Sequence, residues 1–201
     1  MLSDKVRTET YRDAVAKNVE AIQGKKVLDL GCGTGILSMF CARHGQAEQV
    51  VGVDMSSIAH QAMDIVMENN LADTITIVKV IAKKKIQVCK ILCSLLTPSS
   101  LVKQGRLEDT DLKARVGFDK FDVLISEWMG YFLLFEGMLD SVMKARDTYL
   151  TSKKALILPN RCTMHLVGVC DEERYSQTAG YFKDVYGFKM QANIRLVESS
   201  T

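Results

Sequence analysis

The sequence predicts an α/β fold in which helices cover both faces of a mostly parallel sheet. Strand-like apolar runs alternate with stretches whose apolar residues recur at helical spacing. A glycine-rich turn directly follows the first strand-like run, and the second run ends in an acidic residue. The composition agrees, because 47% of the 201 residues are hydrophobic and 25% are charged. Those values are ordinary for globular proteins and exclude disordered, collagen-like and coiled-coil chains.

The elements follow one another with regular punctuation. Residues 26–30 form a short apolar run that ends at GCGTG, as buried parallel strands do. Ser56 or Ser57 would cap a later helix. Residues 156–170 are expected to form two strands around a Pro-Asn turn, and residues 171–190 to be partly helical. The remaining predicted elements are helices at 6–19, 36–45, 56–70 and 136–149 and strands at 49–54, 74–79 and 121–127.

Several classes of protein are excluded early. No apolar run approaches the ~20 residues needed to cross a bilayer, and the charged first segment, MLSDKVRTETYRD, is unlike a signal peptide. We therefore expect a protein of the cytoplasm, and also of the nucleus, without membrane contact. The six cysteines include no Cys-x-x-Cys pair, so we expect reduced thiols and no metal.

The net charge of +2 is unevenly distributed. Residues 80–104 carry five lysines and no acid, which leaves the rest of the chain with a net charge of −3. A single-sign patch can attract polyanions. A lone run of three lysines flanked by Ile and Val is more typical of a solvated turn, so we expect no direct nucleic-acid binding.

The glycine-rich turn indicates a nucleoside cofactor at the carboxyl edge of the sheet. The dinucleotide fingerprint requires a third glycine where this chain has Ile36. An adenosyl ligand without pyrophosphate still needs close backbone approach, which Gly31 and Gly33 allow. Asp29 lies at the same edge and can face an ammonium group directly or through water, and Asp54 can accept hydrogen bonds from both ribose hydroxyls. The alternative is a tight turn without a ligand.

A second motif, SEWMGYFLLFEGML, follows the strand predicted at 121–127. Glu127 and Glu136 are nine residues apart, and a turn through Gly130 would fold both carboxylates over a slot lined by Tyr131 and other aromatic residues. Two neighbouring carboxylates raise each other's pKa unless a cation lies between them, and a guanidinium meets carboxylates bidentately. In the alternative interpretation, one glutamate caps the following helix and the other is exposed.

Taken together, these motifs resemble the catalytic core of the protein arginine N-methyltransferases. The resemblance rests on MLSDKVRTETYRD, VLDLGCGTGILSMF, GVDMSS, ISEWMGYFLLFEGMLDSV, LILPNRCT and VYGFKM. It implies a Rossmann-like S-adenosylmethionine-dependent methyltransferase sheet in residues 1–158 and the truncated start of a β-barrel domain in residues 159–201. It further implies a type I enzyme that forms mono- and asymmetric dimethylarginine. Details such as VRTETYRD, QAMDI and DTITI look most like the third mammalian member, a cytosolic enzyme.

The resemblance also implies residue roles. Glu127 and Glu136 would be catalytic and hold the substrate guanidinium. S-Adenosyl-L-methionine would be bound by Arg7 at its carboxylate, by Gly31 through backbone contacts, by Asp54 at the ribose and by Glu108 at the adenine amino group. Met1 and Met138 match methionines near the transferred methyl group, where their bulk favours asymmetric dimethylation. The implied partners are arginine- and glycine-rich proteins, such as ribosomal proteins or histones.

The chain also departs from the family pattern. The family runs from Lys79 directly to Gly105, whereas here 25 residues, 80–104, intervene. The segment begins with Val and ends with Gln, residues whose codons fit intron borders, and we interpret it as a translated intron or a splice variant. The chain is also expected to lack an upstream helix, most of the barrel and the arm through which family members homodimerise. A catalytically silent isoform that binds cofactor or a full-length partner is therefore the alternative function, ahead of a nucleic-acid methyltransferase.

Overall fold

The computed structural model describes residues 2–80, 112–152, 154–177 and 180–190. The chain divides into two compact units, residues 1–162 and residues 163–201. The first unit contains the described sheet and the candidate site residues, and the second is a short unit of its own.

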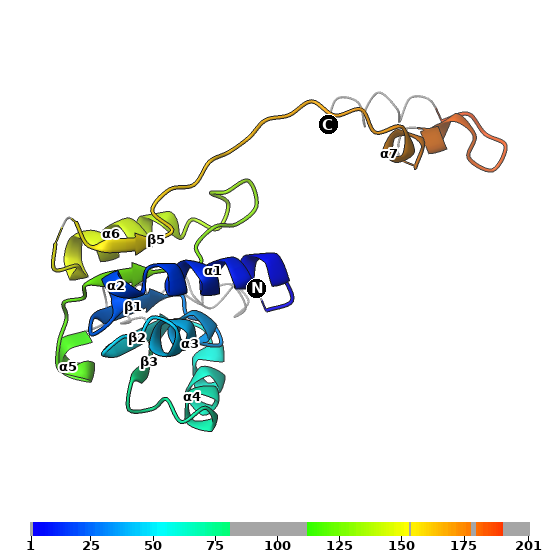
Figure 1. Ribbon diagram of the computed structural model, residues 1–201. Helices are drawn as coiled ribbons and strands as arrows, with labels where there is room; N and C mark the ends of the chain where they lie inside the picture. Colours follow the sequence, from blue (N-terminus) through cyan, green and yellow to red (C-terminus); the bar gives the residue numbers. More distant parts are fainter. Residues whose placement is uncertain (1, 81–111, 153, 178–179, 191–201) are drawn as a thin grey trace, which may run out of the picture. The chain divides into compact units, whose positions relative to one another are not determined.

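The first unit is built on a parallel sheet of five strands in the order β3-β2-β1-β4-β5. Figure 1 shows β1, β2 and β3 side by side in the first unit, with helices beside them. The order reverses at β1, which pairs with β2 on one side and with β4 on the other. In such a sheet, ligands bind beyond the carboxyl ends of the strands at the point of reversal. The strands are β1 (Lys26–Leu30), β2 (Gln49–Asp54), β3 (Ile75–Lys79), β4 (Val123–Ile125) and β5 (Leu156–Leu158).

Alternate residues of the central strands enter two separate cores, because successive side chains of a strand point to opposite faces. Val27, Val50 and Val123 pack with buried residues of the helices on one face. Leu28, Val51 and Leu124 pack with buried residues of the helices on the other. Burial on both faces explains why these strands are continuous apolar runs rather than alternating ones.

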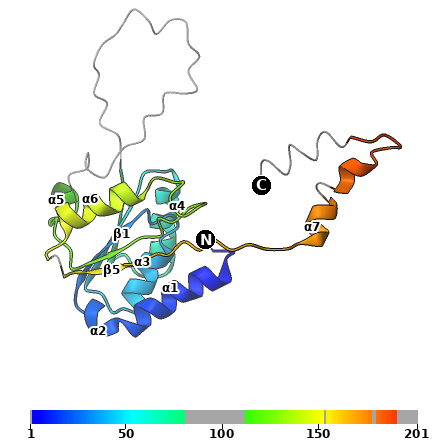
Figure 2. The same cartoon turned by 90° about the horizontal axis from the view of Figure 1, so that it is seen from above.

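The helices divide between the two cores. Buried residues of α1, α2, α3 and α4 belong to the first core, and those of α5 and α6 belong to the second. Figure 2 shows α1, α2 and α3 on the opposite side of the sheet from α5 and α6. The prediction of helices on both faces is confirmed. Their bounds are α1 (Lys5–Lys17), α2 (Val19–Ile22), α3 (Ile36–Arg43), α4 (Ile58–Glu68), α5 (Leu112–Val116) and α6 (Leu139–Tyr149).

The structure corrects three local predictions. Helix α6 begins at Leu139 rather than at residue 136, because the preceding residues form the turns of the glutamate loop. Ser57 stands at the start of α4, but its side chain makes no capping hydrogen bond. The second strand expected within 156–170 is not formed, since a strand needs a hydrogen-bonding neighbour and the described residues provide none after β5.

The second unit contains helix α7 (Glu172–Gln177) and a 3-10 helix, η2 (Gly180–Lys183). Rings of Tyr181 and Phe182 meet edge to face, with centroids 5.5 Å apart. A turn follows in which the backbone N–H groups of Val185 and Phe188 each donate to the other's carbonyl. The prediction that residues 171–190 are partly helical is therefore confirmed.

The unusual segment 80–104 lies outside the described residues except for Val80. Val80 is buried, and its backbone N–H donates to the carbonyl of Asp54 at 2.8 Å. The contact continues the β2–β3 pairing by one step beyond Lys79.

Candidate functional site

The glycine turn after β1 is held against the end of β2. Both Gly31 and Cys32 donate their N–H groups to the carbonyl of Val53, at 2.8 Å and 3.1 Å. Gly31 has φ +75° and Gly33 has φ +54°, a conformation that glycine adopts most readily. A Cβ atom added at Gly31 would lie 2.7 Å from Cε of Met138. The turn therefore lets Met138 approach its backbone, and side chains larger than hydrogen would disturb this arrangement.

Asp54 holds the glycine turn and its own loop together. Its Oδ2 accepts the N–H of Gly33 at 2.9 Å. Its Oδ1 accepts the N–H and the hydroxyl of Ser56, at 2.8 Å and 2.6 Å. An ionised carboxylate has about four acceptor positions. The expected role of Asp54 toward a ribose is therefore compatible with these contacts, which also fix its orientation.

Asp29 is completely buried at the carboxyl end of β1. Its Oδ2 accepts the hydroxyl of Ser38, on α3, at 2.6 Å. Its Oδ1 is buried and has no hydrogen-bond partner among the described residues. Burial raises the pKa of Asp29 to about 7, an effect that the Ser38 hydrogen bonds oppose and the charge of Asp54 reinforces. A buried carboxylate with one unused oxygen is an acceptor awaiting a donor.

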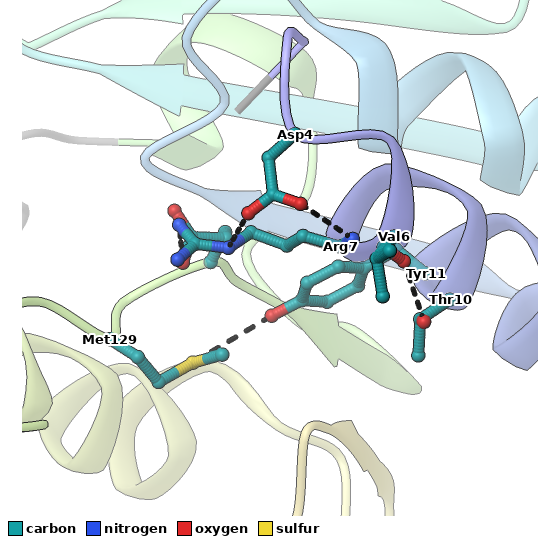
Figure 3. Close-up of polar contacts among 7 residues, drawn as sticks. Asp4, Val6, Arg7, Thr10, Tyr11 and Met129 are labelled. Atoms are coloured by element: carbon teal, nitrogen blue, oxygen red, sulfur yellow. Dashed lines mark hydrogen bonds and ion pairs between the residues drawn. The ribbon is translucent and has the colours of Figure 1, made fainter. Parts of the chain in front are cut away.

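Glu127 follows β4 and makes an ion pair with Arg7 of α1. Nη1 of Arg7 lies 3.3 Å from Oε1 of Glu127. Figure 3 shows the same guanidinium against Asp4, whose Oδ2 lies 3.4 Å from Nε of Arg7. Asp4 also caps α1, because its Oδ1 accepts the backbone N–H of Arg7 at 3.0 Å. Arg7, expected at the cofactor carboxylate, thus binds the carboxylate expected to hold the substrate.

Tyr11, one helical turn beyond Arg7, fixes α1 to the same segment. Its hydroxyl donates to the carbonyl of Ser126 at 3.0 Å and lies 3.8 Å from Sδ of Met129, as drawn in Figure 3 for Met129. Ser126 in turn donates its hydroxyl to the carbonyl of Leu30 at 2.7 Å. Burial, followed by the charge of Glu127, raises the pKa of Tyr11, which stays protonated. The backbone before Glu127 is therefore fixed to both α1 and β1.

Glu136 returns toward Glu127 through the turn at Gly130. The N–H of Gly130 donates to the carbonyl of Leu133 at 3.2 Å, and the side chain of Glu136 lies over Gly130, with Cγ 2.5 Å from an added Cβ. Burial raises the pKa of Glu127, and the charge of Glu136 raises it further, against the opposing effect of Arg7. The charge of one glutamate therefore acts on the other, as expected for carboxylates on one loop.

The aromatic lining expected between the two glutamates is not formed. Tyr131, Phe132 and Phe135 are 85%, 84% and 80% exposed. Trp128 is buried instead in the second core. Phe132 and Leu133 have positive φ, at 50° and 62°, which is uncommon outside glycine. The three exposed aromatic side chains therefore form no buried lining between the two carboxylates.

Two predicted site residues, Met1 and Glu108, lie outside the described residues. Contacts connect Gly33 with Asp54, Gly31 with Met138, and Arg7 with Glu127, whereas Tyr131 is exposed. Three further residues were not predicted from the sequence: Asp4, Tyr11 and Ser38. Asp4 and Ser38 contact Arg7 and Asp29 directly, and Tyr11 binds the backbone of Ser126, next to Glu127. Only the N-capping position of Asp4 before a helix carried a sequence signal. Within the described ranges, no group of three His, Cys, Asp or Glu residues could hold a metal ion.

The groups gathered at this site fit a nucleoside that carries an amino-acid tail. The unused oxygen of Asp29 suits an ammonium group, the cradle at Gly31 admits close approach, and Arg7 is a cation for a carboxylate. The groups that fit the nucleoside and its amino-acid tail all belong to this chain.

None of the helices in the described part of the chain is long and apolar enough to span a membrane.

Comparison with known proteins identifies the family. A family model described as a methyltransferase domain matches residues 4–128. The chain belongs to the methyltransferase family. Protein arginine N-methyltransferase 1 of Saccharomyces cerevisiae is 43% identical over 197 residues, which are 98% of this chain and 48% of that protein. The protein of the same name from Schizosaccharomyces pombe is 44% identical over 94% of this chain and 46% of its own length.

A solved structure agrees with these sequence relatives. The Trypanosoma brucei PRMT1 enzyme-prozyme heterotetrameric complex with AdoHcy is similar over 98% of this methyltransferase chain and 52% of that chain, with a TM-score of 0.73 and 38% identity. The resemblance to the protein arginine N-methyltransferases is thereby confirmed at the level of the family. The Rossmann-like fold of S-adenosylmethionine-dependent methyltransferases is confirmed as well. The chain spans about half the length of the relatives that it matches.

Proposed function

We propose that this methyltransferase transfers a methyl group from S-adenosyl-L-methionine to a guanidino nitrogen of arginine in proteins. One observation carries the choice of acceptor: Glu127, beside Glu136, already binds a guanidinium, that of Arg7. A site that holds one guanidinium in its own fold has the charge and acceptor geometry for another. Similarity to arginine methyltransferases over nearly the whole chain supports the same acceptor.

The chain's residues would divide the work between cofactor and substrate. Asp29, Gly31, Gly33 and Asp54 would hold the cofactor, with Glu108 at its adenine and Arg7 at its carboxylate. When bound, S-adenosylmethionine supplies a methyl group that its sulfonium has already activated. The chain then contributes mainly alignment, which can account for a large part of a barrier.

The two glutamates would do more than hold the substrate. The lone pairs of a guanidinium are delocalised, so each nitrogen is a weak nucleophile. Carboxylates at two of its edges draw positive charge toward the nitrogens they contact and leave the third richer in electrons. Tyr11 and Ser126 would keep Glu127 in place for this task, because they fix the backbone on which it stands.

The finer assignments belong to the same proposal. We infer a type I enzyme, most like the third mammalian member, with residues 1–158 as the methyltransferase domain, 80–104 as an insertion and 159–201 as the start of a barrel. Met138 beside Gly31 supports a role near the transferred methyl group. Arginine- and glycine-rich proteins, such as ribosomal proteins or histones, would be substrates in the cytoplasm and nucleus, and the whole protein would form homodimers.

Transfer of radiolabelled methyl from S-adenosylmethionine to an Arg-Gly-rich peptide tests the proposal. The same preparation is titrated with S-adenosylmethionine in a calorimeter, with the lysine version of the peptide as the control acceptor. Binding together with arginine-dependent label supports the enzyme. Cofactor binding without label under any tested condition supports the alternative, a silent isoform that acts by binding cofactor or a full-length partner. Absence of both contradicts the proposed function.

A further inference from the structure

Ser38 is a residue of α3 whose contacts all lie inside the protein. It is completely buried, as is Asp29, and its hydroxyl donates to Oδ2 of Asp29 at 2.6 Å. A buried hydroxyl of this kind is placed for its partner rather than for solvent. Among the described residues, the hydroxyl of Ser38 donates to Oδ2 of Asp29, whereas Oδ1 of the same carboxylate has no hydrogen-bond partner.

Gly52 makes room for this contact. It lies beside Asp29 in the register of β1 and β2. A Cβ added to Gly52 would lie 3.0 Å from Oγ of Ser38, 3.1 Å from Cβ of Cys32 and 2.7 Å from Cδ1 of Ile77. Strand β2 therefore has no side chain at Gly52, where a Cβ atom would crowd the Ser38 hydroxyl that binds Asp29.

The hydrogen bond selects one oxygen of Asp29 and leaves the other unsatisfied. Leaving a buried acceptor unpaired is costly, and no stabilising partner for Oδ1 is present among the described residues. Asp29 precedes the glycine turn by two residues, on the strand that leads to the cofactor cradle. An ammonium donor arriving there would find an acceptor already oriented.

We propose that Ser38 is a positioning residue that orients Asp29 so that its second carboxylate oxygen accepts from the ammonium group of the cofactor. This inference rests on the proposed function, because it takes the cofactor to be S-adenosylmethionine. Ser38 touches Asp29 and acts on the cofactor only through it. The predicted consequence is discrimination between ligands that carry the amine and ligands that lack it.

The charged and titratable groups near Asp29 determine how ligand binding depends on pH. Burial raises the pKa of Asp29 and the charge of Asp54, on β2, reinforces this effect. Burial also raises the pKa values of Cys32, Cys41 and Tyr11, and the charge of Asp29 raises them further. With a pKa of about 7, Asp29 is partly protonated at neutral pH. An incoming ammonium favours the ionised carboxylate, so amine-bearing ligands are expected to release protons when they bind near pH 7.

Calorimetry with a matched pair of ligands tests the proposal. The probes are S-adenosylhomocysteine and its analogue in which hydrogen replaces the amino group. We expect the full chain to bind S-adenosylhomocysteine roughly 10-fold or more tightly than the analogue, as for a hydrogen bond between charged groups. Ser38→Ala should weaken S-adenosylhomocysteine binding and leave the analogue unchanged, so that the ratio approaches one. Ser38→Cys, with a weak donor of similar size, should give an intermediate ratio.

Proton release in the unmodified chain provides a second readout that needs no variant. Titrations at pH 7 in two buffers of different ionisation enthalpy should show more protons released with S-adenosylhomocysteine than with the analogue. Equal ratios in the original chain and Ser38→Ala would overturn the proposal. If Ser38→Ala does not fold, equal proton release with both ligands would overturn it instead. Failure of the unmodified chain to bind S-adenosylhomocysteine at all would contradict the proposed function rather than the role of Ser38.

Discussion

Residues 29–56 and residues 126–138 supply the two halves of the site in different ways. In the first, Asp29 is buried, and Asp54 accepts one hydrogen bond from Gly33 of the glycine turn and two from Ser56. In the second, the backbone before Glu127 is fixed, while Tyr131, Phe132 and Phe135 in the loop are exposed and the chain has positive φ at two non-glycine positions. The cofactor half is therefore built into the core. The acceptor half is fixed at Ser126, where its backbone is hydrogen-bonded, and is exposed at Tyr131, Phe132 and Phe135.

The difference explains what each half contributes. Groups that must meet one small, invariant ligand gain from being preorganised by the sheet. Under the proposed function the loop would admit a protein substrate, and a position at the surface suits that role. Substitutions in the first half should therefore alter stability and ligand binding together, whereas those in the second should alter turnover and acceptor binding with little change in stability.

The largest expected effect is on turnover in the acceptor half. Glu127→Gln or Glu136→Gln removes one carboxylate from the guanidinium site and should lower methyl transfer to an Arg-Gly-rich peptide ~100-fold or more. The free energy of unfolding should change little by comparison. Initial rates with radiolabelled S-adenosylmethionine measure the loss, and Glu48→Gln, at an exposed glutamate of the same unit, is the control. Near-normal rates in either variant would refute the role of the pair.

The next largest effect is on stability in the cofactor half. Gly52→Ala inserts a methyl group against Ile77, Ser38 and Cys32, and overpacking of this kind costs about 1 to 3 kcal/mol. Urea unfolding measures the change, and Gly168→Ala, where an added Cβ meets nothing within 4 Å, is the matched control. Equal stability of the two variants would show that the strand has room for a side chain at residue 52.

A third prediction concerns pH and sharpens the contrast between a buried and an exposed acid. The folded chain holds the proton of Asp29 up to a pKa of about 7, whereas the unfolded chain loses it near the ordinary value of 3.8. Between these pH values the folded state binds more protons, so its free energy of unfolding falls as pH rises, by at most about 1.4 kcal/mol per pH unit from this group.

Asp29→Asn removes that contribution and should flatten the dependence. Urea unfolding at pH 5 and pH 6 gives the slope for each protein, and the difference between the slopes isolates Asp29. Glu127, whose pKa is also raised, contributes in the same direction in both proteins and cancels. Identical slopes would mean that Asp29 ionises in the folded chain as readily as in the unfolded one.

The smallest expected effect is on stability, at the hydrogen bond between Tyr11 of α1 and the backbone of the acceptor half. Tyr11→Phe removes the hydroxyl that donates to the carbonyl of Ser126 and should cost about 1 kcal/mol of stability. Tyr186→Phe, at a side chain 92% exposed, should cost nothing measurable. Thermal or urea unfolding compares them, and an equal, negligible effect would show that the hydroxyl of Tyr11 does not anchor α1.

The parts of the site that could be predicted from the sequence are those set by local pattern. Apolar runs and the glycine turn locate β1 and β2, so Asp29 and Asp54 fall at the sheet edge as expected. The pairing of Arg7 with Glu127 joins residues 120 positions apart, and no local pattern reports such a contact. Ser38 reads as an ordinary helix residue until Gly52 is placed opposite it. The positive φ values of Phe132 and Leu133, in the loop that carries the exposed aromatic side chains, could not be expected either, because neither residue is glycine.

The most direct test of the central claim is whether the two glutamates recognise a guanidinium as such. Calorimetry should compare an Arg-Gly-rich peptide with its lysine counterpart, in the presence of S-adenosylhomocysteine, on the original chain and on Glu127→Gln/Glu136→Gln. We predict roughly 10-fold tighter binding of the arginine peptide to the original chain, the scale of a bidentate charged contact. The preference should vanish in the double variant. Equal affinity of both peptides for the original chain, or an unchanged preference in the double variant, would contradict the account.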